Sequence, residues 1–254
     1  MSDQDAYLGR QINFALLKMT MIRKLIYGGI LLLTALGSHK VEAQKVTPIE
    51  ILSNSLNTKG LPENWMDFAE KKTLPGGYEE ETLTALSHFP ELKNVKVRFK
   101  IKESYSTLKT KPSFFSMFAP KGHRTYIITI SNKSIDKLTP ILLENLPGDA
   151  RVGVLGHELS HVVDFSSKSV WQSFKVAVSH VSPTYLDKFE YNTDSICIQH
   201  GLGPELAAWS SYIRDTMHTV YWRGSDYVNK GDTKYERYMN PDTIEKHMAK
   251  LEAK

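Results

Sequence analysis

The 254-residue chain is predicted to fold as an α+β domain, with a small mixed sheet followed by a helical C-terminal half. Residues 95–102 alternate strictly between apolar and basic side chains, a pattern typical of a strand with one buried and one solvated face. Residues 126–130 are rich in β-branched side chains and predict a second strand. Beyond residue 147, capping residues and Pro–Gly punctuation mark successive helices.

The predicted elements follow one another without a repeat or a low-complexity tract. Residues 45–75 are polar and punctuated by Pro, Gly and Asn, which predicts a wrapping segment more than a domain. Asp149 is a suitable N-cap for the helix that follows Pro147-Gly148. The predicted helices span residues 79–88, 149–165, 182–200 and 203–217, with a last helix beginning at residue 240.

Composition and charge exclude several classes of protein. Hydrophobic residues make up 41% and charged residues 24% of the chain, proportions that exclude wholesale disorder and a multi-span membrane protein. The net charge is +4, but Lys and Arg are spread along the sequence without a basic run, so no nucleic-acid partner is predicted. Cys197 stands alone, so any metal site must use His and carboxylate ligands.

The N-terminal region has the pattern of a secretory signal. Residues 21–24 open with a cationic stretch, residues 25–37 are largely apolar, and small residues suited to a signal peptidase lie at 41 and 43. We therefore expect residues 1–43 to be a signal-peptide region, with residues 1–20 a mis-called extension or a long cationic segment. A buried N-terminal helix is the alternative. The apolar stretch is too short for a comfortable span, so no stable membrane span is expected after cleavage. An exported protein, periplasmic or secreted, is predicted, with residues 44–254 as its single domain.

The chemistry-bearing motif lies within the helix predicted over residues 149–165. His157 and His161 are four residues apart, so both imidazoles lie on one helical face and can share one Zn²⁺ ion. Glu158 stands beside them, close enough to take a proton from a water bound to that ion. The flanking residues are apolar, so core packing alone explains two His on this helix poorly.

A third ligand is needed to leave one zinc position open for water. Glu190 and Asp194 lie at i and i+4 on the helix predicted over residues 182–200. Glu190 can bind the metal, and Asp194 can hydrogen-bond the outer nitrogen of a ligand His. His180 and Asp164 stay open as alternative third ligands, and a pair of ordinary solvated carboxylates is the bland interpretation.

With these two motifs, the sequence resembles the gluzincin metallopeptidases, such as the thermolysin-like enzymes, over roughly residues 126–209. The resemblance implies a zincin-like fold and a Zn²⁺ cofactor. It implies that His157, His161 and Glu190 are the ligands, that Glu158 is the general base and that Asp194 is the partner of His157. It also implies that residues 126–130 form the sheet-edge strand, which precedes the active-site helix and pairs with an extended substrate.

We therefore expect a zinc-dependent metallopeptidase that hydrolyses a peptide or protein substrate, with Glu158 moving the proton. An oxyanion donor is also required, and His218 or Tyr221 is predicted to supply it. Other candidates for this role are Tyr212, Arg214 and His180. Two other functions compete: a zinc-binding envelope adaptor with the same fold and no turnover, and a secreted binding domain in which both motifs are accidental.

Overall fold

The computed structural model describes residues 61, 63, 65–169, 172, 182–224 and 236–253, all of which belong to one compact unit, Val46–Lys254. The fold is α+β, with a four-stranded mixed sheet and a helical C-terminal half, as predicted. The predicted signal-peptide region lies outside the described residues. Within the described ranges, no helix is both long and apolar enough to cross a membrane.

The sheet has the strand order β1-β2-β4-β3. Strands β1 (Lys72–Thr73), β2 (Lys96–Lys102) and β4 (Thr125–Ser131) run parallel, and β3 (Leu108–Pro112) pairs antiparallel with β4. The strands predicted near 95–102 and 126–130 are thus confirmed as β2 and β4. The edge position implied for residues 126–130 is wrong, because β3 lies between β4 and the edge of the described sheet.

Burial explains why β4 takes an interior position and β3 an edge position. Most of β4 is buried, including polar Thr129 and Ser131, as expected of a strand with neighbours on both sides. The sequence of β3, Leu-Lys-Thr-Lys-Pro, carries two exposed Lys and ends in Pro112, features that natural proteins use on edge strands. Because β3 is short and contains few apolar residues, the sequence did not predict it as a strand.

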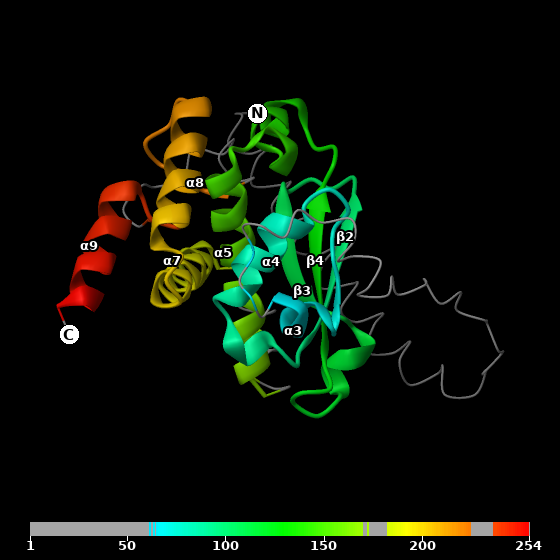
Figure 1. Ribbon diagram of the computed structural model, residues 1–254. Helices are drawn as coiled ribbons and strands as arrows, with labels where there is room; N and C mark the ends of the chain where they lie inside the picture. The colour runs from blue at the N-terminus through cyan, green and yellow to red at the C-terminus, as the bar shows by residue number, and fades with distance from the viewer. Residues whose placement is uncertain are drawn as a thin grey trace. The chain divides into compact units, whose positions relative to one another are not determined.

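Helix α5 (Gly148–Ser167) is the central element of the unit. Figure 1 shows it between the sheet and helix α8 (Gly203–Thr216), with α9 (Pro241–Glu252) beyond α8. The predicted helix is confirmed, but Asp149 is not its N-cap. Pro147 holds that position, and Asp149 lies in the first turn, where its negative charge favours the helix dipole.

Two glycines let α8 approach α5 closely. A Cβ atom on Gly153 would lie 2.1 Å from the backbone oxygen of Glu205, and one on Gly156 would lie 2.5 Å from Cδ1 of Leu202. At Gly153 the close atoms are backbone, so any larger side chain there would force the helices apart, whereas at Gly156 the nearest atom is the end of the flexible Leu202 side chain, which can shift. The two glycines are three residues apart, so they form one small-residue face on α5 immediately before the His157 turn.

The remaining predicted helices are confirmed, and two of them begin with a side-chain N-cap. Helix α4 spans Glu79–Ser87 and helix α7 spans Pro183–Gln199. The side chain of Ser182 accepts a hydrogen bond from the Tyr185 amide at the start of α7. Asn240 caps α9 by accepting from the Thr243 amide. Short 3-10 helices connect the main elements: η3 (Pro90–Leu92), η4 (Phe115–Phe118), η5 (Asp136–Ile141) and η6 (Leu143–Asn145).

The segment predicted to wrap the domain contributes to its core. Its part beyond residue 64 contains helix α3 (Trp65–Ala69) and strand β1, and the side chains of Trp65 and Phe68 are buried. The main core lies between the inner face of the sheet and α5, where each buried large apolar side chain contributes about 1.5–3 kcal/mol. Its central members are Val97, Phe99, Tyr126, Ile128, Ile130, Leu155, Leu159 and Val162. This packing fixes α5, and therefore His157 and Glu158, against β3.

Candidate metal centre

Helices α5 and α7 bring the three predicted ligands together. His157 and His161 project from α5 and Glu190 from α7, and all three side chains are buried. Oε2 of Glu190 lies 3.2 Å from Nε2 of His157 and 3.2 Å from Nε2 of His161. One ligand atom from each residue lies within 4.8 Å of the other two, so the group could bind a metal ion.

The outer nitrogen of each imidazole is engaged by α7. Nδ1 of His157 donates to Oδ1 of Asp194 at 2.7 Å, the contact that the resemblance implies. The Thr193 hydroxyl donates to the backbone oxygen of Phe189 at 3.0 Å, so it accepts from Nδ1 of His161 at 3.1 Å. Both imidazoles therefore carry their proton on Nδ1 and turn Nε2 toward Glu190.

The donor set fits a small cation. Three electron-rich atoms converge in a buried space, and two neutral imidazole lone pairs facing a carboxylate repel one another unless positive charge lies between them. In a tetrahedral zinc site, with ligand bonds of about 2.0–2.1 Å, neighbouring ligand atoms lie about 3.3 Å apart. The two distances of 3.2 Å agree with that spacing.

The charges around the triad also favour a cation there. Burial opposes a charge on His157, but hydrogen bonds to Asp194 and Glu190 outweigh it and raise the pKa of His157 to about 10. Burial likewise opposes ionisation of Glu190, but the charges of His161 and His157 and their hydrogen bonds hold its pKa well below the usual range. Without a metal ion, the carboxylates of Asp194 and Glu190 thus stabilise positive charge at His157, and a bound cation would supply that charge in its place.

Glu158 is held by the edge strand. Its Oε2 atom accepts a hydrogen bond of 2.6 Å from the Thr110 hydroxyl of β3. Burial raises the pKa of Glu158 above its ordinary value, while the charges of His161 and His157 and the Thr110 hydroxyl oppose that rise. A carboxylate whose pKa is raised toward the working pH is better suited to accept and return a proton than one with an ordinary pKa.

A cavity of about 260 Å³ opens over the triad and Glu158. It lies between β3 and α7, with Leu108 and Thr110 on one side and Phe189 and Leu186 on the other. A smaller hollow of about 70 Å³ adjoins it on the far side of His157 and Glu158. The lining of the smaller hollow is mixed: apolar Leu108, Leu138, Val154, Trp209 and Trp222 lie beside polar side chains that include His157, Glu158 and Tyr238.

The backbone of β3 has no strand partner on its outer edge among the residues that the structure describes. The Ser113 amide donates to the oxygen of Thr125 at 2.8 Å, which fixes the alternation of the antiparallel ladder. By that alternation, odd-numbered residues of β3 pair with β4, and the N–H and C=O groups of Leu108 and Thr110 point away from it. Pro112 lacks an N–H, so the free edge ends there.

Tyr238 supplies a phenol to the same cavity. Its ring centroid lies 5.5 Å from that of His157, and it lines both hollows. No described residue hydrogen-bonds its hydroxyl. Burial, reinforced by the charge of Glu190, raises the pKa of Tyr238 well above its usual value, so the hydroxyl stays protonated and can donate.

Two backbone contacts hold the segment that carries Tyr238. The Met239 amide donates to Oδ2 of Asp194 at 2.7 Å, and a guanidinium nitrogen of Arg214 donates to the Tyr238 carbonyl at 2.9 Å. Asp194 therefore positions His157 with one carboxylate oxygen and the Tyr238 segment with the other.

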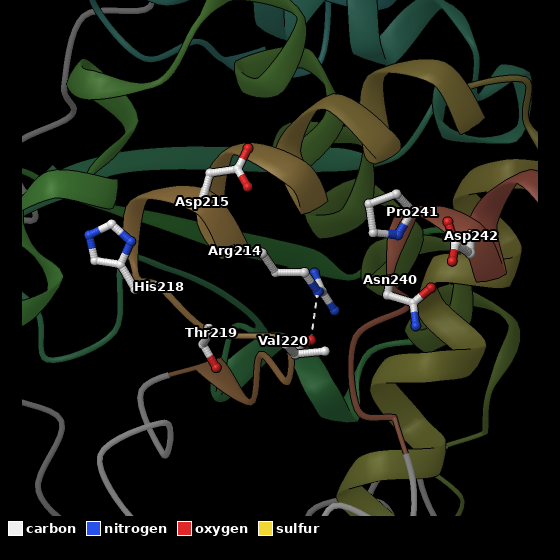
Figure 2. A pocket seen from close by; sticks show the side chains of 8 residues that line it. All are labelled: Arg214, Asp215, His218, Thr219, Val220, Asn240, Pro241 and Asp242. Atoms are coloured by element: carbon white, nitrogen blue, oxygen red, sulfur yellow. Dashed lines mark hydrogen bonds between the residues drawn. The ribbon is translucent and has the colours of Figure 1, made fainter.

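The predicted oxyanion donors lie elsewhere. His218 lines a separate open pocket of about 550 Å³, with Asp215 on one side and the start of α9 on the other (Figure 2). Tyr221 is 50% exposed. Neither residue lines the two hollows at His157, whereas Tyr238 lines both.

The other candidates have different placements. Asp164 forms an ion pair with Lys168 and is not part of the group that could bind a metal. The Tyr212 hydroxyl donates to the backbone oxygen of Asn145. Arg214 donates to the backbone oxygens of Val220, Ser210 and Tyr238. His180 lies outside the described residues.

Sequence reasoning missed Thr193, Thr110 and Tyr238. Thr193 could have been found, because it lies three residues after Glu190 on the face that carries Asp194. Thr110 and Tyr238 gave no signal, since one lies on an unpredicted strand and the other is distant in sequence from both motifs.

Compared with known proteins, the chain matches no family model, and no curated protein or solved structure matches it.

Proposed function

We propose that this chain is an exported, zinc-dependent metallopeptidase with a zincin-like fold, of the gluzincin type. One observation carries the proposal: His157, His161 and Glu190 converge in a cavity that also holds Glu158. Zinc bound at this group would supply a Lewis acid that lowers the pKa of a water and polarises a carbonyl.

The side chains around this group would orient the ligands, transfer the proton and stabilise the developing negative charge. Asp194 and Thr193 orient the two imidazoles, and Thr110 holds Glu158 by its Oε2 atom. The Glu158 carboxylate takes a proton from the attacking water and passes it to the leaving amine. The Tyr238 hydroxyl donates to the carbonyl oxygen of the substrate as negative charge develops there.

The shape of the cavity supports an extended peptide as substrate. The free N–H and C=O groups of Leu108 and Thr110 can pair with a peptide backbone added to the sheet edge. The small hollow beside His157 has Leu138, Trp209 and Trp222 in its wall and can take a small side chain of that peptide. Glu158 itself lies between the two hollows, where a bond of the paired peptide would be attacked.

An envelope adaptor that binds zinc without turnover is the second candidate, and Glu158 distinguishes the two. The experiment is cleavage of a peptide library by the full chain, beside a Glu158→Gln variant and a matched Glu245→Gln control on exposed α9. We expect the wild type and the control to cleave, and Glu158→Gln to keep its zinc and lose cleavage. Zinc binding without cleavage in the wild type would favour the adaptor.

A further inference from the structure

The outer face of the sheet, which points away from α5, carries a cluster of exposed basic side chains. Strand register places Lys100 and Lys109 on either side of Thr129, and Arg98 and Lys111 on either side of Ile127. These positions share one face because they are directly paired across neighbouring strands. The basic face consists of six exposed residues: Lys96, Arg98, Lys100, Lys102, Lys109 and Lys111.

Among the described residues, no acidic side chain pairs with a cation of this face. None of the six cations forms a hydrogen bond or an ion pair with another residue in the described part of the chain. The β4 residues between the two basic strands are uncharged. Burial, followed by the charges of Lys102 and Lys111, lowers the pKa of Lys109, as expected where like charges crowd together.

An exposed aromatic cluster adjoins the basic face at its Lys111 end. Phe114, Phe115 and Phe118 are 53%, 88% and 70% exposed. The Phe114 ring contacts the other two edge to face, with its centroid 5.5 Å from that of Phe115 and 6.2 Å from that of Phe118. Clustered exposed apolar side chains mark an interaction surface more often than a solvated one.

We propose that the basic face and the Phe cluster together dock the protein on an anionic membrane surface. The cations would lie against lipid phosphates, and the phenyl rings would enter the boundary of the acyl chains. Along a strand, side chains on one face repeat about every 6.8 Å, and β2 and β3 lie about 9.6 Å apart. This regular array of cations can meet a layer of negatively charged head groups.

The side chains favour lipid over nucleic acid. Sheets that bind single-stranded RNA stack bases on aromatic residues of the sheet face itself. Here the uncharged positions of that face are Thr125, Ile127, Thr129 and Ser131, which offer no stacking platform. Five of the six cations are Lys, which interacts as a point charge, while Arg is the residue preferred for reading bases. The Phe rings lie together beside the sheet, as a hydrocarbon-seeking cluster would.

The test is binding of the full chain to phosphatidylcholine vesicles with and without phosphatidylglycerol. An Arg98→Glu, Lys100→Glu variant reverses two charges on the basic face. A Lys246→Glu, Lys250→Glu variant makes the same change on exposed residues of α9. We expect the gain from anionic lipid to fall about 30-fold or more in the first variant only, and to weaken in high salt. An equal loss in both variants would overturn the proposal.

A local readout tests the Phe cluster separately. Cys197 is buried, so a polarity-sensitive dye can be attached through Phe115→Cys, with Lys250→Cys as the matched control. We expect anionic vesicles to shift the emission at position 115 to the blue and to leave position 250 unchanged. No shift at 115, or tight binding to an RNA oligonucleotide without binding to vesicles, would contradict a membrane surface.

Discussion

The two faces of the sheet differ in the side chains that they carry and in their exposure to solvent. The inner face packs on α5 with apolar side chains and presents Thr110 to Glu158. The outer face carries exposed cations and makes no ion pair among the described residues. Strand β3 contributes to both, with Leu108 and Thr110 facing inward and Lys109 and Lys111 outward. Neighbouring residues on one strand should therefore affect different measurements, because side chains alternate between faces.

The largest effect on activity is expected in the cavity on the inner side of the sheet, at Tyr238. Tyr238→Phe removes the donor proposed for the developing oxyanion, so kcat should fall about 10²–10³-fold with zinc content unchanged. Steady-state kinetics on a cleaved peptide measures the loss. Tyr221→Phe is the matched control, because that hydroxyl is not in the cavity. Equal effects of the two substitutions would show that Tyr238 has no such role.

Asp194→Asn should weaken zinc binding about 10–100-fold, because the orienting partner of His157 loses its charge. Competition with a zinc-binding dye measures the affinity. The substitution should also reduce kcat at saturating zinc, since Asp194 accepts from the Met239 amide and so holds the Tyr238 segment. Unchanged zinc affinity would remove Asp194 from the account of the metal centre.

Thr110→Val should have a smaller effect that depends on pH. The Thr110 hydroxyl stabilises the ionised form of Glu158, so its loss raises the pKa of Glu158 further. Because the ionised carboxylate is the active form, the acidic limb of the rate profile should move to higher pH. We expect activity to fall about tenfold at pH 6 and less at pH 8, as for a lost hydrogen bond to a charged group. Thr110→Ser should restore the profile, and an unshifted limb would contradict the role.

The smallest effect is expected on the outer face. Arg98→Glu with Lys100→Glu should leave hydrolysis of a soluble peptide within about twofold and the free energy of unfolding within about 0.5 kcal/mol, as is usual for surface substitutions. Thermal unfolding and the same kinetic assay measure both. A large loss of either property would show that the two faces are not independent.

The sequence predicted what is local and missed what depends on the third dimension. The spacing of His157 and His161 is set by one helix, and Glu190 with Asp194 by another, so each pair was visible in the sequence. The Thr110–Glu158 contact depends on β3, whose Lys and Pro hid the strand.

The basic face was missed for the same reason. Lys and Arg look dispersed along the sequence, and they gather only when β2 and β3 lie on either side of β4. The close approach of α8 to α5 at Gly153 likewise needs knowledge of which helices pack together. Pairing between distant segments is decided by the packed core, which a local pattern does not record.

The central claim is that His157, His161 and Glu190 hold one metal ion. Elemental analysis of the purified full chain tests it directly, beside His161→Ala, Glu190→Ala and an Asp164→Ala control. We expect about one zinc per chain in the wild type and the control, and loss of zinc in the other two variants. A wild-type chain without zinc after reconstitution, or zinc that survives Glu190→Ala, would contradict the account.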